Sequence, residues 1–225
     1  MNMKFIFTFL LASSALLAQE TTPLDSSYAN GYYVERLAFF ELLPNRVNEI
    51  VFMGNSITEV GDWQEIILQP NVVNRGISGD NSYGVFHRLD EVLVSNPMKL
   101  FIMIGVNDIK RGTPISKILM NYERIAGKVK KEAPETLLYF QSVLPVTEPI
   151  LATIYNQINN EKIRTLNEGI KAIAKKYNLV YIDLHNEVFL DSKGQLKREL
   201  TTDGLHLKPA SYFLWIDYLQ KHLYL

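Results

Sequence analysis

The chain has 225 residues, of which 47% are hydrophobic and 21% are charged, and this balance excludes an intrinsically disordered protein. Its formal net charge of −1 gives no reason to expect binding to nucleic acid or to an anionic membrane surface. Because the chain has no cysteine, it cannot form disulfide bonds, use a thiol nucleophile, bind metal through thiolates or carry a lipid on an N-terminal cysteine.

The N-terminal segment, residues 1–18, has the pattern of a secretory signal peptide. Lys4 is its only charged residue, an apolar run covers residues 5–11, and small residues dominate residues 12–15. Cleavage would leave residues 19–225, which we expect to form one secreted or periplasmic domain without stable membrane insertion. An uncleaved anchor is the alternative, but the apolar run is shorter than the ~20 residues that a bilayer requires.

Short apolar runs alternate with amphipathic stretches along the rest of the chain. The runs are typical of strands buried on both faces, and the stretches show helical spacing of apolar residues. In chain order we predict a helix over 33–43, a strand over 49–53, a helix over 63–68, a strand over 71–74, a helix over 84–94, a strand over 99–104, a helix over 116–131, a strand over 137–141, a helix over 161–177, a strand over 179–182 and a helix over 209–223. This alternation predicts an α/β fold with a parallel sheet covered by helices on both faces.

Four short polar blocks stand at the ends of these elements. They comprise residues 54–58 (Gly-Asn-Ser-Ile-Thr), 76–80 (Gly-Ile-Ser-Gly-Asp), 105–108 (Gly-Val-Asn-Asp) and 203–206 (Asp-Gly-Leu-His). The first three follow predicted strands, and the fourth precedes the last helix. Because ligand sites in parallel sheets lie outside the carboxyl ends of the strands, the ordered set indicates a functional site there.

Ser56, His206 and Asp203 carry the groups of a serine-nucleophile site. A serine hydroxyl becomes an effective nucleophile when a base removes its proton, and His206 could be that base. Asp203, three residues earlier, could bind the imidazole, fix its tautomer and stabilise the imidazolium. The structural alternatives are a helix cap for Ser56 and for His206 and a turn for Asp203. His185, which follows Asp183 at a strand end, is the alternative base.

Gly79 and Asn107 are candidate oxyanion donors, together with the backbone N–H of Ser56. A glycine lets its N–H approach a substrate closely, and an asparagine amide offers a neutral donor. The structural alternatives are an ordinary turn for Gly79 and an Asx turn for Asn107. The histidines are scattered without metal-ligand spacing, so no metal site is predicted, and no glycine-rich phosphate loop is present.

The four blocks resemble those of the SGNH (GDSL-like) hydrolase family, over residues 49–211. The similarity is closest to the branch with platelet-activating-factor acetylhydrolase-like proteins and bacterial carbohydrate O-acetylesterases. It implies a flavodoxin-like, three-layer α/β/α sandwich, no cofactor, and an acyl pocket bordered by residues 141–145. One position departs from the family pattern, because Asn55 stands where the family usually has Asp. Since this position is outside the triad, we expect activity to persist with altered local hydrogen bonding and pH dependence.

The resemblance and the predicted export together imply a secreted serine esterase that removes short acyl groups, chiefly acetyl, from a small acylated substrate. Carbohydrates such as sialic acid or plant polysaccharide are the expected substrates, and no nucleic-acid partner is expected. A lysophospholipase or thioesterase is the alternative enzyme, and it would need a long apolar groove. Trp63, Tyr83, Tyr212 and Phe213 could line one, although aromatic residues at these spacings more often lie in the core. The same fold class would also suit a non-catalytic binding protein or a nucleotide binder. The loop over residues 145–160 could border the site.

Overall fold

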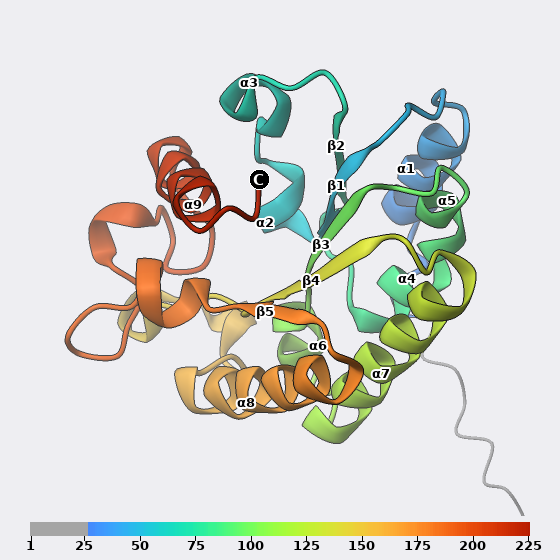
Figure 1. The fold of residues 1–225 in the computed structure, drawn as a ribbon. Coiled ribbons are helices and arrows are strands. Elements are labelled where there is room, and N and C mark those ends of the chain that lie inside the picture. The colour runs from blue at the N-terminus through green and yellow to red at the C-terminus, as the bar shows by residue number, and fades with distance from the viewer. Residues whose placement is uncertain (1–26) are drawn as a thin grey trace, which may run out of the picture.

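The computed structural model describes residues 27–225, and the expected signal peptide lies outside the described residues. Within this part of the chain, five parallel strands form one sheet in the order β2-β1-β3-β4-β5 (Figure 1). The strands are β1 (Ile50–Gly54), β2 (Val72–Gly76), β3 (Lys99–Met103), β4 (Leu137–Gln141) and β5 (Val180–Ile182). The predicted parallel sheet is therefore confirmed.

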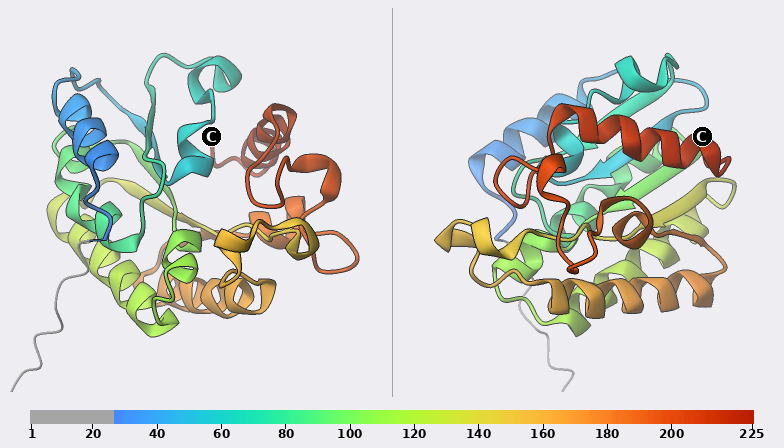
Figure 2. Two further views of the ribbon diagram at one scale, coloured as in Figure 1. Left: turned by 180° about the vertical axis from the view of Figure 1, so that it is seen from behind. Right: turned by 90° about the vertical axis from the view of Figure 1, so that its left-hand side faces the viewer.

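Helices cover both faces of the sheet (Figures 1 and 2). The α-helices are α1 (Gly31–Glu41), α2 (Ser56–Glu59), α3 (Trp63–Ile67), α4 (Ser82–His87), α5 (Leu89–Leu93), α6 (Val106–Lys110), α7 (Ile115–Glu132), α8 (Asn160–Tyr177) and α9 (Pro209–Lys221). Single turns of 3-10 helix occur at Glu148–Ile150, Thr153–Tyr155 and Arg198–Leu200, and a π-helical turn occurs at His185–Phe189. Helices α7 and α8 pack on one face and α3 and α9 on the other, which confirms the three-layer α/β/α architecture.

An aromatic ladder fills the core between the sheet and the α3–α9 layer. Phe52, Phe101 and Tyr139 lie side by side on β1, β3 and β4, with ring centroids 4.9 and 4.5 Å apart. Trp63 stacks on Phe52 at 4.2 Å, and Tyr212 packs edge-on against Trp63 at 5.6 Å. These contacts bury Trp63 and Tyr212, so both belong to the core, as is more common for aromatic residues at these spacings, and neither lines a groove.

The predicted helix over 84–94 is wrong as one element, because the structure has two short helices there. Arg88 separates α4 from α5 with φ −95° and ψ 12°. Its guanidinium turns into the interior, where Nε lies 2.9 Å from Asp80 Oδ2 and Nη2 donates to the carbonyl of Gly54 at 3.0 Å. A buried guanidinium must be paired, and this pairing redirects the chain at Arg88.

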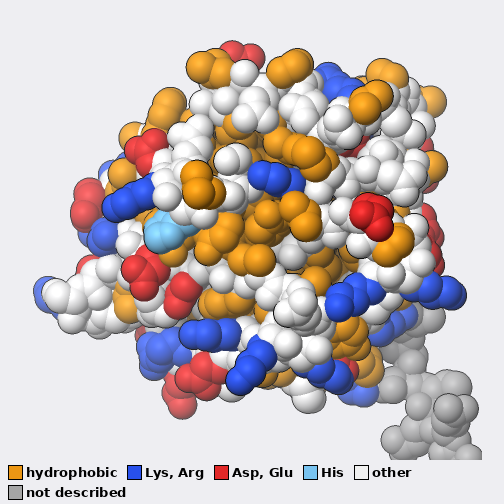
Figure 3. All heavy atoms as spheres, in the orientation of Figure 1, with side chains coloured by type: hydrophobic (Ala, Val, Ile, Leu, Met, Phe, Trp, Pro, Cys, Tyr) orange, Lys and Arg blue, Asp and Glu red, His pale blue; other side chains and the backbone are white. Residues whose placement is uncertain are grey.

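The amino ends of the strands lie on the face that carries the C-terminus, since Lys99 Nζ at the start of β3 donates to the carbonyl of Tyr224 at 2.8 Å. Figure 3 shows hydrophobic side chains gathered in the middle of the face that Figure 1 presents, ringed by charged ones. Leu137 and Val180, the first residues of β4 and β5, keep much of their surface exposed.

Between residues 27 and 225, no helix is both long enough and apolar enough to span a bilayer.

Candidate active site

The carboxyl ends of β2, β1 and β3 lie next to one another, and the first three polar blocks follow them. Ser56 begins α2, Gly79 lies in the turn after β2, and Asn107 lies in the first turn of α6. Since β1 pairs with both β2 and β3, the topology brings the three residues to one edge of the sheet.

Ser56, His206 and Asp203 form a continuous hydrogen-bonded series. Ser56 Oγ lies 3.1 Å from His206 Nε2, although 150 residues separate them in sequence. His206 Nδ1 lies 2.7 Å from Asp203 Oδ2. Because the carboxylate faces Nδ1, that nitrogen carries the proton of the neutral imidazole. Nε2 is then free to accept the proton of the serine hydroxyl.

The Asp203 carboxylate is held in its ionised form. Its other oxygen, Oδ1, accepts from the backbone N–H of His206 at 2.7 Å and from that of Leu205 at 3.0 Å. Burial raises the pKa of Asp203, but the hydrogen bonds from His206 and Leu205 outweigh burial and lower the pKa below its ordinary value. A charged carboxylate therefore faces the imidazole at neutral pH.

A tight turn fixes the Asp203–His206 block. Gly204 adopts φ +90°, and a Cβ at this position would lie 2.8 Å from the carbonyl oxygen of Thr147. The backbone N–H of Thr147 in turn donates to the carbonyl of Gly204 at 2.8 Å. Tyr155 lies beyond, with its ring centroid 6.5 Å from that of His206. The predicted border between the loop over 145–160 and the site is confirmed.

Two of the candidate oxyanion donors, Asn107 and Gly79, lie next to Asp80. Asn107 Nδ2 donates to the carbonyl of Asp80 at 2.9 Å, which leaves its second amide hydrogen for a ligand. Gly79, the residue before Asp80, adopts φ +81°, a conformation that favours glycine. Within residues 27–225, the backbone N–H groups of Gly79 and Ser56 have no acceptor. These donors remain available for a developing negative charge.

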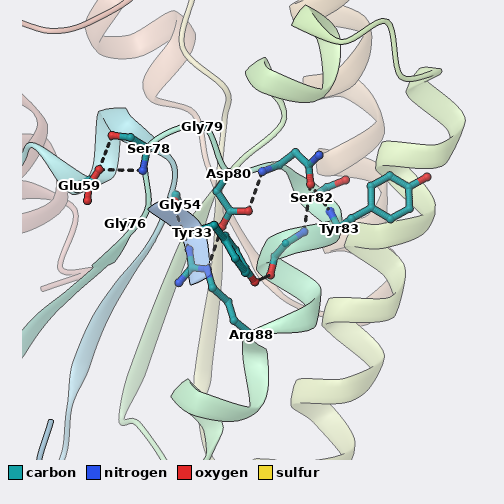
Figure 4. A network of polar contacts seen from close by, with 12 residues as sticks. Tyr33, Gly54, Glu59, Gly76, Ser78, Gly79, Asp80, Ser82, Tyr83 and Arg88 are labelled. Atoms are coloured by element: carbon teal, nitrogen blue, oxygen red, sulfur yellow. Dashed lines mark hydrogen bonds and ion pairs between the residues drawn. The ribbon is translucent and has the colours of Figure 1, made fainter. Parts of the chain in front are cut away.

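Two buried aspartates that were given no role from the sequence support these loops, and Figure 4 shows the first of them, Asp80. Asp80 pairs with Arg88, and burial raises the pKa of Asp80 to about 6 against the opposing effect of the guanidinium. Asp108 accepts from the hydroxyl of Ser82 at 2.6 Å and from its backbone N–H, and burial raises the pKa of Asp108 to about 7. The sequence did contain an indication of their importance, because each aspartate is the last residue of a polar block that follows a buried strand.

Glu59 was also missed, because it lies just beyond the first block. Its Oε2 accepts hydrogen bonds from the backbone N–H and the hydroxyl of Ser78, the residue before Gly79 (Figure 4). Its Oε1 accepts from the hydroxyl of Tyr32 at 2.5 Å and lies 3.3 Å from Arg36 Nε. Helix α1 is thus connected to the loop of Gly79 through a single carboxylate.

Asn55 caps the helix that begins at Ser56. Its Oδ1 accepts from the backbone N–H of Ile57 at 3.0 Å, a role that an aspartate oxygen would perform equally. His185, the alternative base, lies elsewhere: its side chain is buried, and Nδ1 lies 3.1 Å from the carbonyl of Val143. The structure therefore pairs Ser56 with His206 and not with His185.

A very small apolar pocket of about 10 Å³ lies next to Ser56, lined by the residues on either side of it. Its lining consists of Asn55, Ile57, Met103, Ile104, Val106, Val143, Leu144, Pro145 and Leu205. One wall is fixed to α8, because the Asn167 side chain binds both backbone groups of Val143 and the Asn160 side chain binds both of Val146, at 2.8–2.9 Å. In the part of the chain that the structure describes, no three histidine or acidic side chains cluster as metal ligands would.

A profile of the GDSL-like lipase/acylhydrolase family matches residues 52–213 and so spans all four blocks. The chain belongs to this family. Membership supports hydrolase activity, and the family resemblance found in the sequence is confirmed.

Three proteins illustrate what this chain is similar to. A Streptococcus pneumonia protein provisionally described as a platelet activating factor is 32% identical, with a TM-score of 0.78 over 86% of this chain and 93% of its own. The acetyl xylan esterase AlAXEase shares the fold at 21% identity, with a TM-score of 0.64 over 78% of this chain and 99% of its own. The N-acylneuraminate cytidylyltransferase of Streptococcus agalactiae serotype III is 25% identical over 167 residues, which are 70% of this chain but only 38% of that protein.

Proposed function

We propose that the protein is a serine esterase that removes short acyl groups, chiefly acetyl, from carbohydrates. The observation that carries this proposal is the series of hydrogen bonds from Asp203 through His206 to Ser56 at the carboxyl edge of the sheet. The backbone N–H groups of Ser56 and Gly79 and the amide of Asn107 add donors on the same edge. A nucleophile, an oriented base and oxyanion donors are the parts that acyl transfer requires.

In the first half-reaction, Ser56 Oγ attacks the carbonyl carbon of the ester while its proton passes to His206 Nε2. The Asp203 carboxylate stabilises the resulting imidazolium. The carbonyl oxygen becomes an oxyanion, which accepts from Ser56 N–H, Gly79 N–H and the Asn107 amide. The bond to the leaving alcohol then breaks, and His206 returns the proton to that alcohol, leaving an acyl ester on Ser56.

In the second half-reaction, water replaces the alcohol. His206 takes a proton from the water as its oxygen attacks the acyl carbon, and the same donors hold the oxyanion. The bond to Ser56 Oγ breaks, His206 protonates that oxygen, and the carboxylic acid leaves. The enzyme returns to its starting state without a cofactor.

The apolar pocket, which at about 10 Å³ has room for little more than one water-sized group, supports a short acyl group. Its lining is aliphatic apart from Asn55, and its backbone wall is held by the hydrogen bonds from Asn160 and Asn167. A rigid wall resists the displacement that a longer chain would need. The burial of Trp63 and Tyr212 removes two of the four aromatic residues that a long lipid groove would have used.

The carbohydrate substrate rests on the named relatives. One acts, by its name, on acetyl xylan, and another on an N-acylneuraminate, so both are concerned with sugars. We also propose that the protein is exported, on the basis of the charge and hydropathy pattern of residues 1–18. Fractionation of producing cells, with the mass of the recovered chain, tests this part.

The test measures hydrolysis of p-nitrophenyl acetate, butyrate and octanoate by the wild-type protein and by the variants Ser56→Ala and His206→Ala. We expect acetate to be hydrolysed fastest, and each variant to lower kcat by at least about 10⁴-fold. His222→Ala, which removes an exposed histidine at the end of α9, is the matched control and should keep full activity.

Three outcomes would contradict the proposal. A preference for octanoate would favour the lysophospholipase or thioesterase alternative. Acetate turnover that is unchanged in both variants would place the chemistry elsewhere. Absence of turnover, together with no labelling of Ser56 by a fluorophosphonate, would favour a binding protein on the same fold.

A further inference from the structure

Helix α6 and its C-cap residue carry two cations on the same side as Asn107. Lys110 and Arg111 follow Asn107 by three and four residues, the spacing that stacks side chains on one face of a helix. Since Asn107 contributes to the candidate oxyanion site, the next turn of this face lies at the rim of that site. The positions of both cations are fixed by contacts with other site residues.

Arg111 lies beside Gly79. Its Nη2 donates to the carbonyl of Gly79 at 2.8 Å, and its side chain is otherwise exposed. A guanidinium has five N–H donors, and among the described residues only this one is engaged. A planar group with several free donors suits a carboxylate. The Asn30 amide nitrogen, 4.0 Å from the position of a Cβ on Gly79, adds a neutral donor to this side of the rim.

Lys110 lies on the side of His206. Its Nζ is 4.8 Å from the ring centroid of Tyr155, whose ring packs edge-on against His206. A cation over an aromatic face is held in place while its N–H donors remain accessible. The two cations therefore lie at different parts of the site. Lys110 is next to the base, His206, through Tyr155, and Arg111 is next to an oxyanion donor, Gly79.

Two of the carboxylates that contact this site have cationic partners, since Glu59 lies against Arg36 and Asp80 is buried against Arg88. Asp203 binds the neutral imidazole of His206 and keeps its negative charge. The acyl pocket contains no charged side chain. The two cations outnumber the one carboxylate that has no cationic partner, so the net charge of these groups is positive, and the cations lie outside the pocket that would hold the acyl group.

We propose that Lys110 and Arg111 form a subsite for a carboxylate on the alcohol portion of the ester. The preferred substrate is then an acetylated acidic sugar and not a neutral one. This inference rests on the proposed esterase function, because it assigns the leaving alcohol of that reaction. Arg111 binds the carboxylate through its free guanidinium edge, and Lys110 adds a second charge from the other side.

The test compares two substrates that differ only in charge, an O-acetylated methyl hexuronoside and its carboxamide, by release of acetate. We expect kcat/KM to be about 10-fold higher for the acid at low salt, in the range of charge-assisted hydrogen bonds near solvent. The preference should shrink as sodium chloride is raised, because salt screens exposed charges.

Lys110→Gln and Arg111→Gln should each reduce the acid-to-amide ratio several-fold. The ratio is the readout because Arg111 also binds the carbonyl of Gly79, so its substitution can slow both substrates. Lys131→Gln removes an exposed charge from the C-terminal end of α7 and should leave the ratio unchanged.

Equal rates on the acid and the amide, or a ratio unchanged in both rim variants, would overturn the subsite while leaving the esterase function intact. Failure of the wild type to hydrolyse p-nitrophenyl acetate and both sugars would overturn the two together.

Discussion

Glu59 accepts two hydrogen bonds from Ser78, one from the backbone N–H at 2.8 Å and one from the hydroxyl, through the same carboxylate oxygen. Ser78 immediately precedes Gly79, so these bonds fix the peptide that leads into a candidate oxyanion donor. Arg111 holds the other side of the same turn by donating to the carbonyl of Gly79. Glu59 therefore acts as a positioning residue for Gly79 without facing the substrate.

Replacing Glu59 with glutamine should lower kcat and leave KM nearly unchanged. The glutamine oxygen can still accept both bonds from Ser78, but its NH2 group then faces Arg36 and replaces an acceptor with a donor. The side chain is therefore held less firmly, and the Gly79 N–H becomes less well placed for the oxyanion. Complete loss of one oxyanion donor costs about 10²–10³-fold in kcat, and we expect about 10-fold from displacement alone. Steady-state kinetics with p-nitrophenyl acetate give both constants.

Glu65→Gln, which changes an exposed glutamate on α3, is the control. Ser78→Ala should reproduce part of the Glu59→Gln effect, because it removes the hydroxyl and keeps the backbone N–H. An increase in KM at constant kcat would contradict a positioning role, since that pattern marks lost ground-state binding.

Asp108 makes the stability of the fold depend on pH. Burial raises the pKa of Asp108 from 3.8 to about 7, so between these values the folded protein binds a proton that the unfolded chain releases. The free energy of unfolding therefore falls as pH rises through this interval, by up to ~1.4 kcal/mol per pH unit for one proton. Asp80, with its pKa raised to about 6, acts in the same direction.

Asp108→Asn should flatten this dependence, because an asparagine has the shape of the protonated carboxyl and does not titrate. Urea unfolding at pH 5, 6, 7 and 8 measures the slope. Asp217→Asn, which removes an exposed carboxylate on α9, should keep the wild-type slope. Equal slopes for wild type and Asp108→Asn would show that Asp108 stays ionised when buried.

The sheet could be predicted from sequence because its strands are buried on both faces and so appear as continuous apolar runs. The break at Arg88 could not, because it depends on an ion pair with Asp80 that forms only after α4 packs against the sheet. The short helices α2 and α6 were missed for a related reason. Each has only four or five residues, too few to show helical periodicity.

The candidate site was predictable to the extent that its chemistry lies in compact blocks. Ser56, His206 and Asp203 are brought within hydrogen-bonding distance, as their residue types and order had indicated. The residues that position the loop of Gly79 and the pocket wall were not predictable, because Glu59 and Asn167 act through backbone groups of other elements. A side chain that binds a distant backbone group leaves no local pattern in the sequence.

Asn167 is expected to be a major contributor to stability. It lies on α8, and its side chain binds both the N–H and the carbonyl of Val143, at 2.8 and 2.9 Å. Asn167→Ala leaves the buried N–H of Val143 without an acceptor, which should reduce the free energy of unfolding by about 2–4 kcal/mol. Glu168→Ala changes the neighbouring, exposed residue, and its free energy of unfolding should stay within about 0.5 kcal/mol of the wild-type value. Comparable losses in the two variants would contradict this role.

The size of the acyl pocket should set the preferred chain length. Leu144 is buried in the wall of this pocket, and truncation to alanine would open space next to the acyl group of the substrate. One or two extra methylene groups in an apolar pocket are worth about 1–3 kcal/mol, so Leu144→Ala should raise the butyrate-to-acetate ratio of kcat/KM by about 10-fold. Rates with the two p-nitrophenyl esters measure this ratio directly.

A buried leucine-to-alanine change also destabilises a protein by about 2–5 kcal/mol, so the ratio needs a control of similar stability. Leu93→Ala removes an equally buried leucine on α5, near the amino end of β3 and away from the pocket. It should lower the thermal midpoint and leave the chain-length preference as in the wild type. If both variants shifted the preference equally, general loosening of the fold would explain the change, and Leu144 would not determine acyl length.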